Sequence, residues 1–381
     1  MSGSITPYDT ADGKRYRVRY RKPDKSQTDK RGFRTKKEAQ LFLASVTVSK
    51  AVGEYIDPSL ARATVGDLHE DWLAGKKVLK PSAYAQLPIA YRVHVEPKWG
   101  HREVGSILPS EVQTWVASIT QDKDDGTKGR SATVALRALG VLAGILDMAV
   151  ADRRIHRNPA RGLKNLPRKA KKKPGRTYLT HDQLHRLAAE SARPELVLIL
   201  GYTGLRWGEA AALRIRNVNM LRHRLHVEEN AVQVGGKTVV GTPKTWQVRS
   251  VPFPPFLSPL LERLSRGKGP DDLLFGDGIT HLRPPRFGDG WFDGAITRLQ
   301  RADETFPRVT AHDLRHTAAS LAVAAGANVK ALQRMLGHES AAITLDIYTD
   351  LFDDDLNGVA TKLEEHARAQ SVGKTWAALL A

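Results

Sequence analysis

The chain has 381 residues, of which 41% are hydrophobic, so its length suits two or three domains with cores of their own. It contains no cysteine, which excludes disulfides, thiolate metal sites and a cysteine nucleophile and fits a reducing compartment. The N-terminus lacks the layout of a signal peptide, and no apolar run approaches the length of a bilayer span. We therefore expect a cytoplasmic protein with no membrane partner.

The net charge is +18, from 59 Lys and Arg against 41 Asp and Glu. Nearly all of this excess lies in residues 1–176, because residues 177–381 carry 24 basic and 23 acidic side chains. Such a distribution favours binding to a polyanion by the first part of the chain and a more specialised second part. A basic surface that only keeps the protein soluble is the alternative.

Residues 13–22 alternate between apolar and cationic side chains, which predicts a strand with one face of each kind. A turn and a returning strand at 27–34 follow, a capping box of Thr35 and Glu38 then begins a helix, and 5–8 can add a short third strand. A sheet with a cationic face can enter a DNA major groove, whereas the alternative is an edge strand protected by its charges. The candidate DNA contacts on this face are Arg15, Arg17, Arg19 and Arg21.

The middle of the chain predicts a helical region and then a linker. From Thr64 to about Leu163 the apolar periodicity is mostly helical. Residues 167–176 hold two prolines, six positive charges and no apolar side chain larger than alanine, so we expect them not to fold by themselves. The candidate phosphate contacts in this linker are Lys169, Lys171, Lys172 and Lys173.

From Thr180 the pattern changes to a compact mixed domain. A helix begins at Thr180, an apolar helix spans 195–202, and strands are expected at 224–234, 237–240 and 247–251, the first two joined by Gly235-Gly236. Most of the remainder is helical.

The segment Thr203–Glu209 predicts a helix start where Arg206 lies near exposed N–H groups and can contact a bound anion. Trp207 and Ala211 fall on the buried side of this helix, and Glu209 can orient the arginine. An ordinary surface arginine in a helix cap is the alternative.

A second helix start is predicted at Thr310, with Thr310 as N-cap and Asp313 at the third helical position. His312 and Arg315 are three residues apart, so we expect them to share a face and one pocket. His316 is rotated off that face, and we interpret it as structural.

Leu336-Gly337 ends a further helix at a glycine cap, and His338 begins the next segment. Tyr348 follows in a stretch whose Ile343 and Ile347 are expected to face the core. Without the residues upstream, Tyr348 would be interpreted as a buried aromatic side chain.

These residue types together suit one reaction at a phosphodiester. Two guanidinium groups neutralise the phosphate and stabilise the charge added in the transition state, histidines handle protons, and Tyr348 can attack. A lysine on the strand hairpin can protonate the leaving oxygen: Lys244 is the candidate, with Lys237 and Arg249 as competitors. No metal or cofactor is needed, and no acidic triad with metal-ligand spacing occurs in the sequence.

On these motifs the chain resembles the tyrosine recombinase family, in particular mycobacteriophage-like phage integrases with an N-terminal arm-binding domain. The resemblance is strong over 180–350 and looser before it. It implies a 3′-phosphotyrosyl intermediate, a free 5′-hydroxyl and strand exchange through a Holliday junction, without ATP or metal. It makes Arg206 the first arginine, Lys244 the hairpin lysine, and His312 and Arg315 the His-x-x-Arg pair. It makes His338 the second histidine and Tyr348 the nucleophile.

The resemblance also implies a multidomain fold. A small α+β arm-type DNA-binding domain is expected at 1–60, an all-α core-binding domain at 61–165, the basic linker at 166–176, and a mixed, mainly α catalytic domain with a small antiparallel sheet at 177–350. In similar proteins a C-terminal tail such as 351–381 packs on a neighbouring protomer, and a frayed terminus is the alternative.

The implied partners are double-stranded DNA with core-type and arm-type attachment sites, and further copies of the chain in a homotetramer on that DNA. The family usually also uses a host DNA-bending protein and a directionality factor. The implied function is integration and excision of phage DNA in a bacterial host cytosol. The alternatives are an invertase, a resolvase, a transposon recombinase or a relaxing topoisomerase of similar chemistry, and a non-enzymatic architectural DNA-binding protein.

Overall fold

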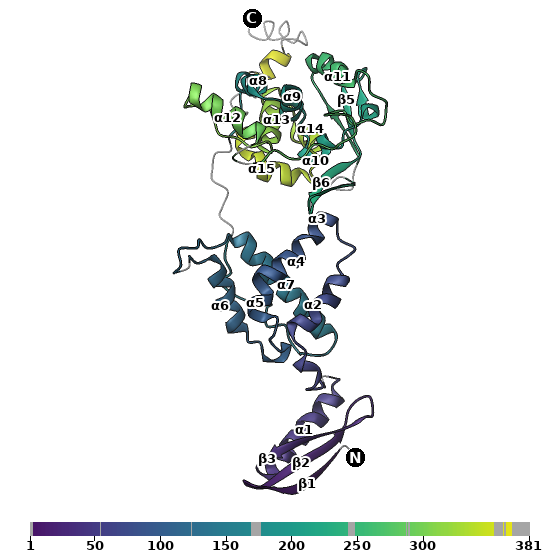
Figure 1. Cartoon of the computed structure of the whole chain (residues 1–381), viewed down its shortest axis with the longest axis vertical. Coiled ribbons are helices and arrows are strands. Elements are labelled where there is room, and N and C mark those ends of the chain that lie inside the picture. Colours follow the sequence, from purple (N-terminus) through teal and green to yellow (C-terminus); the bar gives the residue numbers. More distant parts are fainter. Residues whose placement is uncertain are drawn as a thin grey trace, which may run out of the picture. The chain divides into compact units, whose positions relative to one another are not determined.

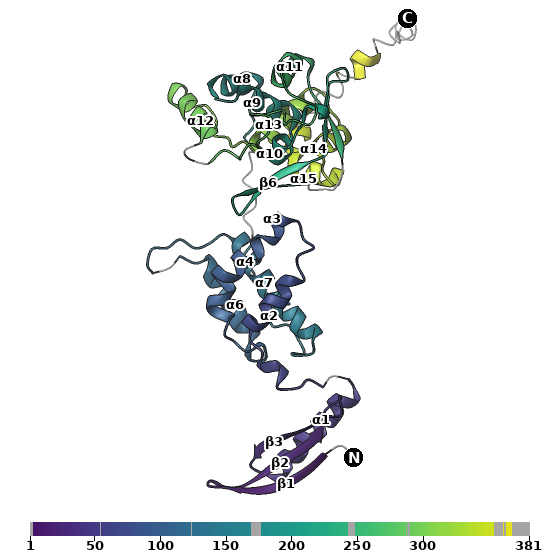
Figure 2. The same ribbon diagram turned by 45° about the vertical axis from the view of Figure 1, so that its right-hand side comes forward.

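The computed structural model describes residues 3–53, 55–122, 124–168, 177–242, 248–286, 288, 290–353, 361 and 363–367. The chain divides into two compact units, residues 1–172 and 173–381, which are drawn from two directions in Figure 1 and Figure 2. The candidate residues that lie outside the described part are Lys169, Lys171, Lys172, Lys173 and Lys244.

Unit 1 begins with a three-stranded antiparallel sheet, β1 (Gly3–Thr10), β2 (Gly13–Arg21) and β3 (Gln27–Phe33), in the order β1-β2-β3. The expected third strand is therefore present and is longer than 5–8. Helix α1 (Lys36–Ala51) begins at the predicted capping box and lies along one face of the sheet, where Val18 and Tyr20 are buried (Figure 1). Because successive side chains of a strand point to opposite faces, the four arginines of β2 lie on the face that α1 leaves open.

The rest of unit 1 is helical. It contains η1 (Leu60–Arg62), α2 (Val65–Ala74), α3 (Pro81–Tyr84), α4 (Gln86–Ala90), the π-helical η2 (Tyr91–Val95), α5 (Glu96–Trp99), η3 (Val104–Ser106), α6 (Pro109–Thr120) and α7 (Ala132–Ala151). Helix α7 is long and apolar enough to cross a membrane by length and composition, so the expectation that no apolar run has that length is wrong. Its Leu142, Ile145 and Leu146 are fully buried, and it packs against α2 and α6, which identifies it as the core helix of this part.

Unit 2 is mainly helical. Its helices are α8 (His181–Glu190), α9 (Pro194–Thr203), α10 (Trp207–Ala211), η4 (Ile215–Asn217), η5 (Pro255–Leu257), α11 (Ser258–Ser265), α12 (Trp291–Ala302), α13 (Asp313–Ala324), α14 (Val329–Leu336) and α15 (Ala341–Asp353). The apolar helix α9 lies at the centre and packs against α8 and α13. The predicted start of α8 is confirmed, because Thr180 and Gln183 form a capping box.

The strands of unit 2 form two small antiparallel sheets. One has the order β4-β5-β8, from β4 (Val218–Asn219), β5 (Arg224–Val227) and β8 (Arg249–Pro252), and the other is the hairpin of β6 (Asn230–Val234) and β7 (Lys237–Gly241). The prediction of one strand over 224–234 is wrong, because Glu228 and Glu229 interrupt it and accept hydrogen bonds from the side chains of Asn217 and Arg214. The third expected strand pairs with β5 instead of continuing the hairpin, which projects from the rest of unit 2 (Figure 2).

Two local predictions near the end of the chain are also wrong. Helix α13 begins at Asp313, so Thr310 is not its N-cap; instead the Asp313 carboxylate accepts hydrogen bonds from the Thr310 N–H and hydroxyl, both at 2.7 Å. Ile343 is 37% exposed, because the buried face of α15 carries Thr344 and, four residues later, Tyr348. Ile347 is partly buried, as expected.

Candidate active site

Arg206 lies at the junction between α9 and α10. Gly204 adopts a left-handed conformation with φ 64° and ends α9, so that Arg206 becomes the N-cap of α10. The backbone N–H of Arg206 donates to Glu209 Oε2 at 2.8 Å, and its guanidinium Nη1 donates to Oε1 at 2.9 Å. Glu209 therefore orients Arg206, as the spacing predicts.

Glu209 is shared between two arginines. Glu209 is 1% exposed, and its carboxylate accepts a bidentate pair of hydrogen bonds from Arg249 of β8, at 2.9 and 2.6 Å. Burial opposes its ionisation, but the hydrogen bonds and charge of Arg249, together with the charge of Arg206, outweigh burial and lower the pKa of Glu209 to about 2. Arg249 also donates to the Met335 carbonyl, so the structure places it as an anchor within the site, on β8 and not on the hairpin of β6 and β7.

Arg315 of α13 is buried, and its guanidinium donates at 2.6 Å to the carbonyls of both Gly204 and Leu336. Arg206 reaches the next carbonyl, that of Gly337, at 3.4 Å. The two guanidinium groups thus meet at consecutive carbonyls at the end of α14, directly before His338. Burial, followed by the charge of Arg206, lowers the pKa of Arg315 to about 9, which leaves it charged at neutral pH.

His338 and Tyr348 face each other beside this arginine pair. Their rings are stacked at a centroid distance of 6.3 Å, and His338 Nδ1 is hydrogen-bonded to the Thr344 hydroxyl at 2.9 Å. Burial, followed by the charges of Arg315 and Arg206, lowers the pKa of His338 to about 4, so its imidazole is neutral at pH 7. Tyr348 is 1% exposed, and its backbone is non-helical, with φ −129° and ψ 21° inside α15.

His316 contacts the tyrosine hydroxyl. Its Nδ1 lies 2.8 Å from the Tyr348 oxygen, so the residue that the sequence analysis interprets as structural contacts the candidate nucleophile. The ring of His312 lies 5.3 Å from that of His316. The two histidines are four residues apart, which places them on the same side of a helical turn. The prediction from the sequence uses only the spacing between His312 and Arg315 and not this one.

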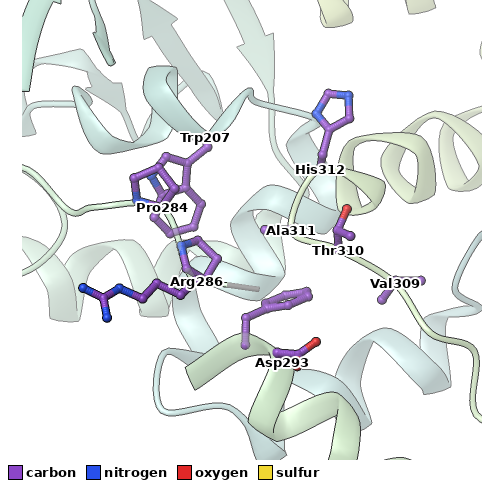
Figure 3. A pocket seen from close by; sticks show the side chains of 10 residues that line it. Trp207, Pro284, Arg286, Asp293, Val309, Thr310, Ala311 and His312 are labelled. Atoms are coloured by element: carbon purple, nitrogen blue, oxygen red, sulfur yellow. The ribbon is translucent and has the colours of Figure 1, made fainter. Parts of the chain in front are cut away.

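His312 also lines a cavity of about 260 Å³. Trp207 and Pro284 lie on one side of this cavity and the segment 309–312 on the other (Figure 3). Arg315 does not line this cavity, and the expectation that His312 and Arg315 face one pocket stays a prediction.

The structure thus gathers Arg206, Glu209, Arg315, His338 and Tyr348, with His312 at their edge. The competitor Lys237 is exposed at the start of β7. Sequence reasoning missed the contacts of Arg249, His316 and Thr344 with this group. Within the described ranges, no group of three or more His, Asp or Glu side chains is placed to hold a metal ion.

Known proteins are similar to this chain in sequence and in fold. The model of the phage integrase family matches residues 177–354. The integrase of Mycobacterium phage L5 is 30% identical over 270 residues, which span 67% of this chain and 68% of the integrase. A tyrosine recombinase of Thermosipho africanus is 24% identical over 268 residues, which span 69% of this chain and 87% of that protein.

Among solved structures, the Tn1549 transposon integrase in complex with a circular intermediate DNA has the same fold. Its TM-score is 0.59 at 19% sequence identity, and the match covers 74% of this chain and 94% of that chain. The family model and the relative that is 30% identical settle the family: the chain belongs to the phage integrase family of tyrosine recombinases.

Proposed function

We propose that the protein is a site-specific DNA integrase that cuts and rejoins DNA by transesterification through a 3′-phosphotyrosine intermediate. One observation carries this proposal: Arg206 and Arg315 meet at the carbonyls of Leu336 and Gly337, beside a histidine that stacks on Tyr348. A tyrosine next to two converging guanidinium groups is the arrangement that nucleophilic attack on a phosphodiester requires.

Arg206 and Arg315 bind the scissile phosphate in this proposal. A guanidinium has five N–H donors, so each arginine can bind phosphate oxygens in addition to the carbonyls and carboxylate that hold it in place. Glu209 fixes Arg206 before DNA binds, which reduces the reorganisation that the transition state requires.

Tyr348 attacks the phosphorus, a new O–P bond forms, and the bond from phosphorus to the 5′-oxygen breaks. His312 and His338 assist proton transfer, and the leaving 5′-oxygen takes a proton from Lys244, with Lys237 of the hairpin as the competitor. Attack by a 5′-hydroxyl on the phosphotyrosine reverses the step and joins the strands. The phosphodiester energy is kept in the intermediate, so the reaction needs no ATP.

The domain roles belong to the same proposal. Residues 1–60 bind arm-type sites through the open face of β2, residues 61–165 bind the core site, and the lysines of the basic linker 166–176 contact phosphates. Residues 177–350 form the catalytic domain, and residues 351–381 contact a neighbouring protomer. The protein acts in the cytosol of a bacterial host as a homotetramer that passes through a Holliday junction, with a host bending protein and a directionality factor.

The test is a covalent adduct with DNA. Wild-type protein incubated with a nicked suicide duplex of its attachment site should form a protein–DNA adduct, and Tyr348→Phe should bind the duplex without forming one. An adduct with Tyr348→Phe would show that Tyr348 is not the nucleophile. If the wild type formed no adduct, the protein would not be an enzyme of this kind, and the alternative of an architectural DNA-binding protein would be favoured.

A transposon recombinase is the second candidate, because one of the solved structures with the same fold is a transposon integrase. The DNA beside the gene separates the two: a phage attachment site supports integration of phage DNA, and transposon ends support the alternative.

A further inference from the structure

We propose that His316 is the base that takes the proton of Tyr348 as its oxygen attacks the phosphate. This role rests on the proposed function and adds a residue to its mechanism. His316 Nδ1 lies 2.8 Å from the Tyr348 oxygen, which is within the reach that a general base needs. The two rings meet at 62° with centroids 5.6 Å apart, so a ring nitrogen of His316, and not its face, meets the hydroxyl.

The other two imidazoles are placed differently. His338 lies nearly parallel to the phenol ring, at 12°, and its Nδ1 is hydrogen-bonded to Thr344. The exposed His312 has its ring against that of His316. His316, in contrast, has a ring nitrogen at hydrogen-bond distance from the attacking oxygen.

The position of His316 in the chain supports this role. It directly follows Arg315, so one helix carries both a phosphate ligand and the base. The titratable and charged groups described around it are His312 at the N-cap of α13, Arg315 on α13, Tyr348 on α15 and His338 between α14 and α15. Tyr178 packs against the same cluster from the segment before α8.

The proton balance of the step is complete. The proton moves from the Tyr348 oxygen to Nδ1 of His316 while the O–P bond forms and the bond to the 5′-oxygen breaks. The leaving oxygen takes its proton from a different group. In the reverse step, the imidazolium of His316 returns the proton to Tyr348 when the 5′-hydroxyl attacks.

Two substitutions separate a base from a residue that only orients the tyrosine. His316→Ala removes the hydrogen bond, whereas His316→Asn keeps a group that can bond to the hydroxyl but cannot accept its proton. His185→Asn is the matched control, because His185 Nε2 is also hydrogen-bonded to a tyrosine hydroxyl, that of Tyr202, at 3.1 Å, outside the site.

The measurement is the single-turnover rate of adduct formation on the nicked suicide duplex, at saturating protein, between pH 5.5 and 9. We expect both His316 variants to bind DNA and to lose roughly 10²- to 10³-fold in rate, whereas His185→Asn keeps the wild-type rate. The wild-type rate should fall as the pH is lowered through the range in which an imidazole takes up a proton, and His316→Ala should lose this dependence and recover rate with added imidazole.

A wild-type rate of adduct formation in His316→Asn would show that the hydrogen bond only orients Tyr348. A wild-type or faster rate in His316→Ala would show that the hydrogen bond only holds Tyr348 in its buried position. Either result would refute the proposal that His316 is the general base. Failure of the proposed function itself is distinguishable, since it would appear as a wild type without adduct or as an adduct with Tyr348→Phe.

Discussion

Replacing Glu209 by glutamine tests the electrostatic centre of the site. The side chain of Glu209 is completely buried and that of Arg249 is 9% exposed, so an uncharged amide would leave Arg249 with no counter-charge in a buried position. The pKa of Glu209 is about 2 in the folded chain against an ordinary 4.5. This difference corresponds to roughly 3 kcal/mol of folding free energy at neutral pH, within the range measured when one partner of a buried ion pair is removed.

The assay is a urea titration of the full chain, with hydrogen exchange of the peptides at 194–212 used to assign the transition to unit 2. The free energy of unfolding should fall by about 3 kcal/mol in Glu209→Gln at pH 7, and by less than about 0.5 kcal/mol in the control Glu262→Gln, whose side chain is exposed on α11. Because the pKa of Glu209 is lowered by folding, its contribution is complete above the unfolded value of 4.5 and is lost as the pH falls toward 2.

The difference between wild type and Glu209→Gln should therefore narrow below pH 4.5. A loss under about 1 kcal/mol at pH 7, or a difference that is constant with pH, would show that Arg206 and Arg249 do not depend on this carboxylate and would refute the reasoning.

Three further outcomes are expected. Arg206→Ala and Arg315→Ala should retain most DNA binding in a filter or gel assay but lose at least roughly 10²-fold in the rate of adduct formation. An equal loss of DNA binding and of adduct formation would mean that the two arginines only anchor the phosphate. Alanine at all four β2 arginines, which are Arg15, Arg17, Arg19 and Arg21, should weaken arm-site binding and leave core-site cleavage unchanged. The slope of log K against log salt concentration should decrease in magnitude by up to about 3.6. An unchanged slope would show that the sheet does not contact the DNA. Gly337→Ala should lower the free energy of unfolding by about 1 kcal/mol more than Gly326→Ala in the same urea titration. Both glycines have positive φ, but only the new Cβ at position 337 would lie 2.8 Å from Arg249 Cδ. Equal losses of unfolding free energy would show that the Arg249 side chain moves aside.

Local sequence patterns were enough to predict many of the helices and strands and the type of chemistry. The alternation over 13–22, the capping boxes at Thr35 and Thr180 and the glycine cap at Gly337 depend on residues within one or two turns of each other, so their patterns can be recognised without knowledge of the fold. The contact between Arg206 and Glu209 was predictable for the same reason, because the two residues share one turn of helix.

Contacts between residues that are distant in the sequence follow from the packing of the whole domain. The strand predicted over 224–234 divides because its two glutamates bond to side chains of an earlier segment, and β8 pairs with β5 across more than twenty residues. The binding of Glu209 by Arg249, the approach of Arg315 to Gly204 and Leu336, and the hydrogen bond between His316 and Tyr348 likewise join separate elements. Such contacts depend on how α9, α13, α14 and β8 pack around one core, and no local pattern of residues encodes that packing.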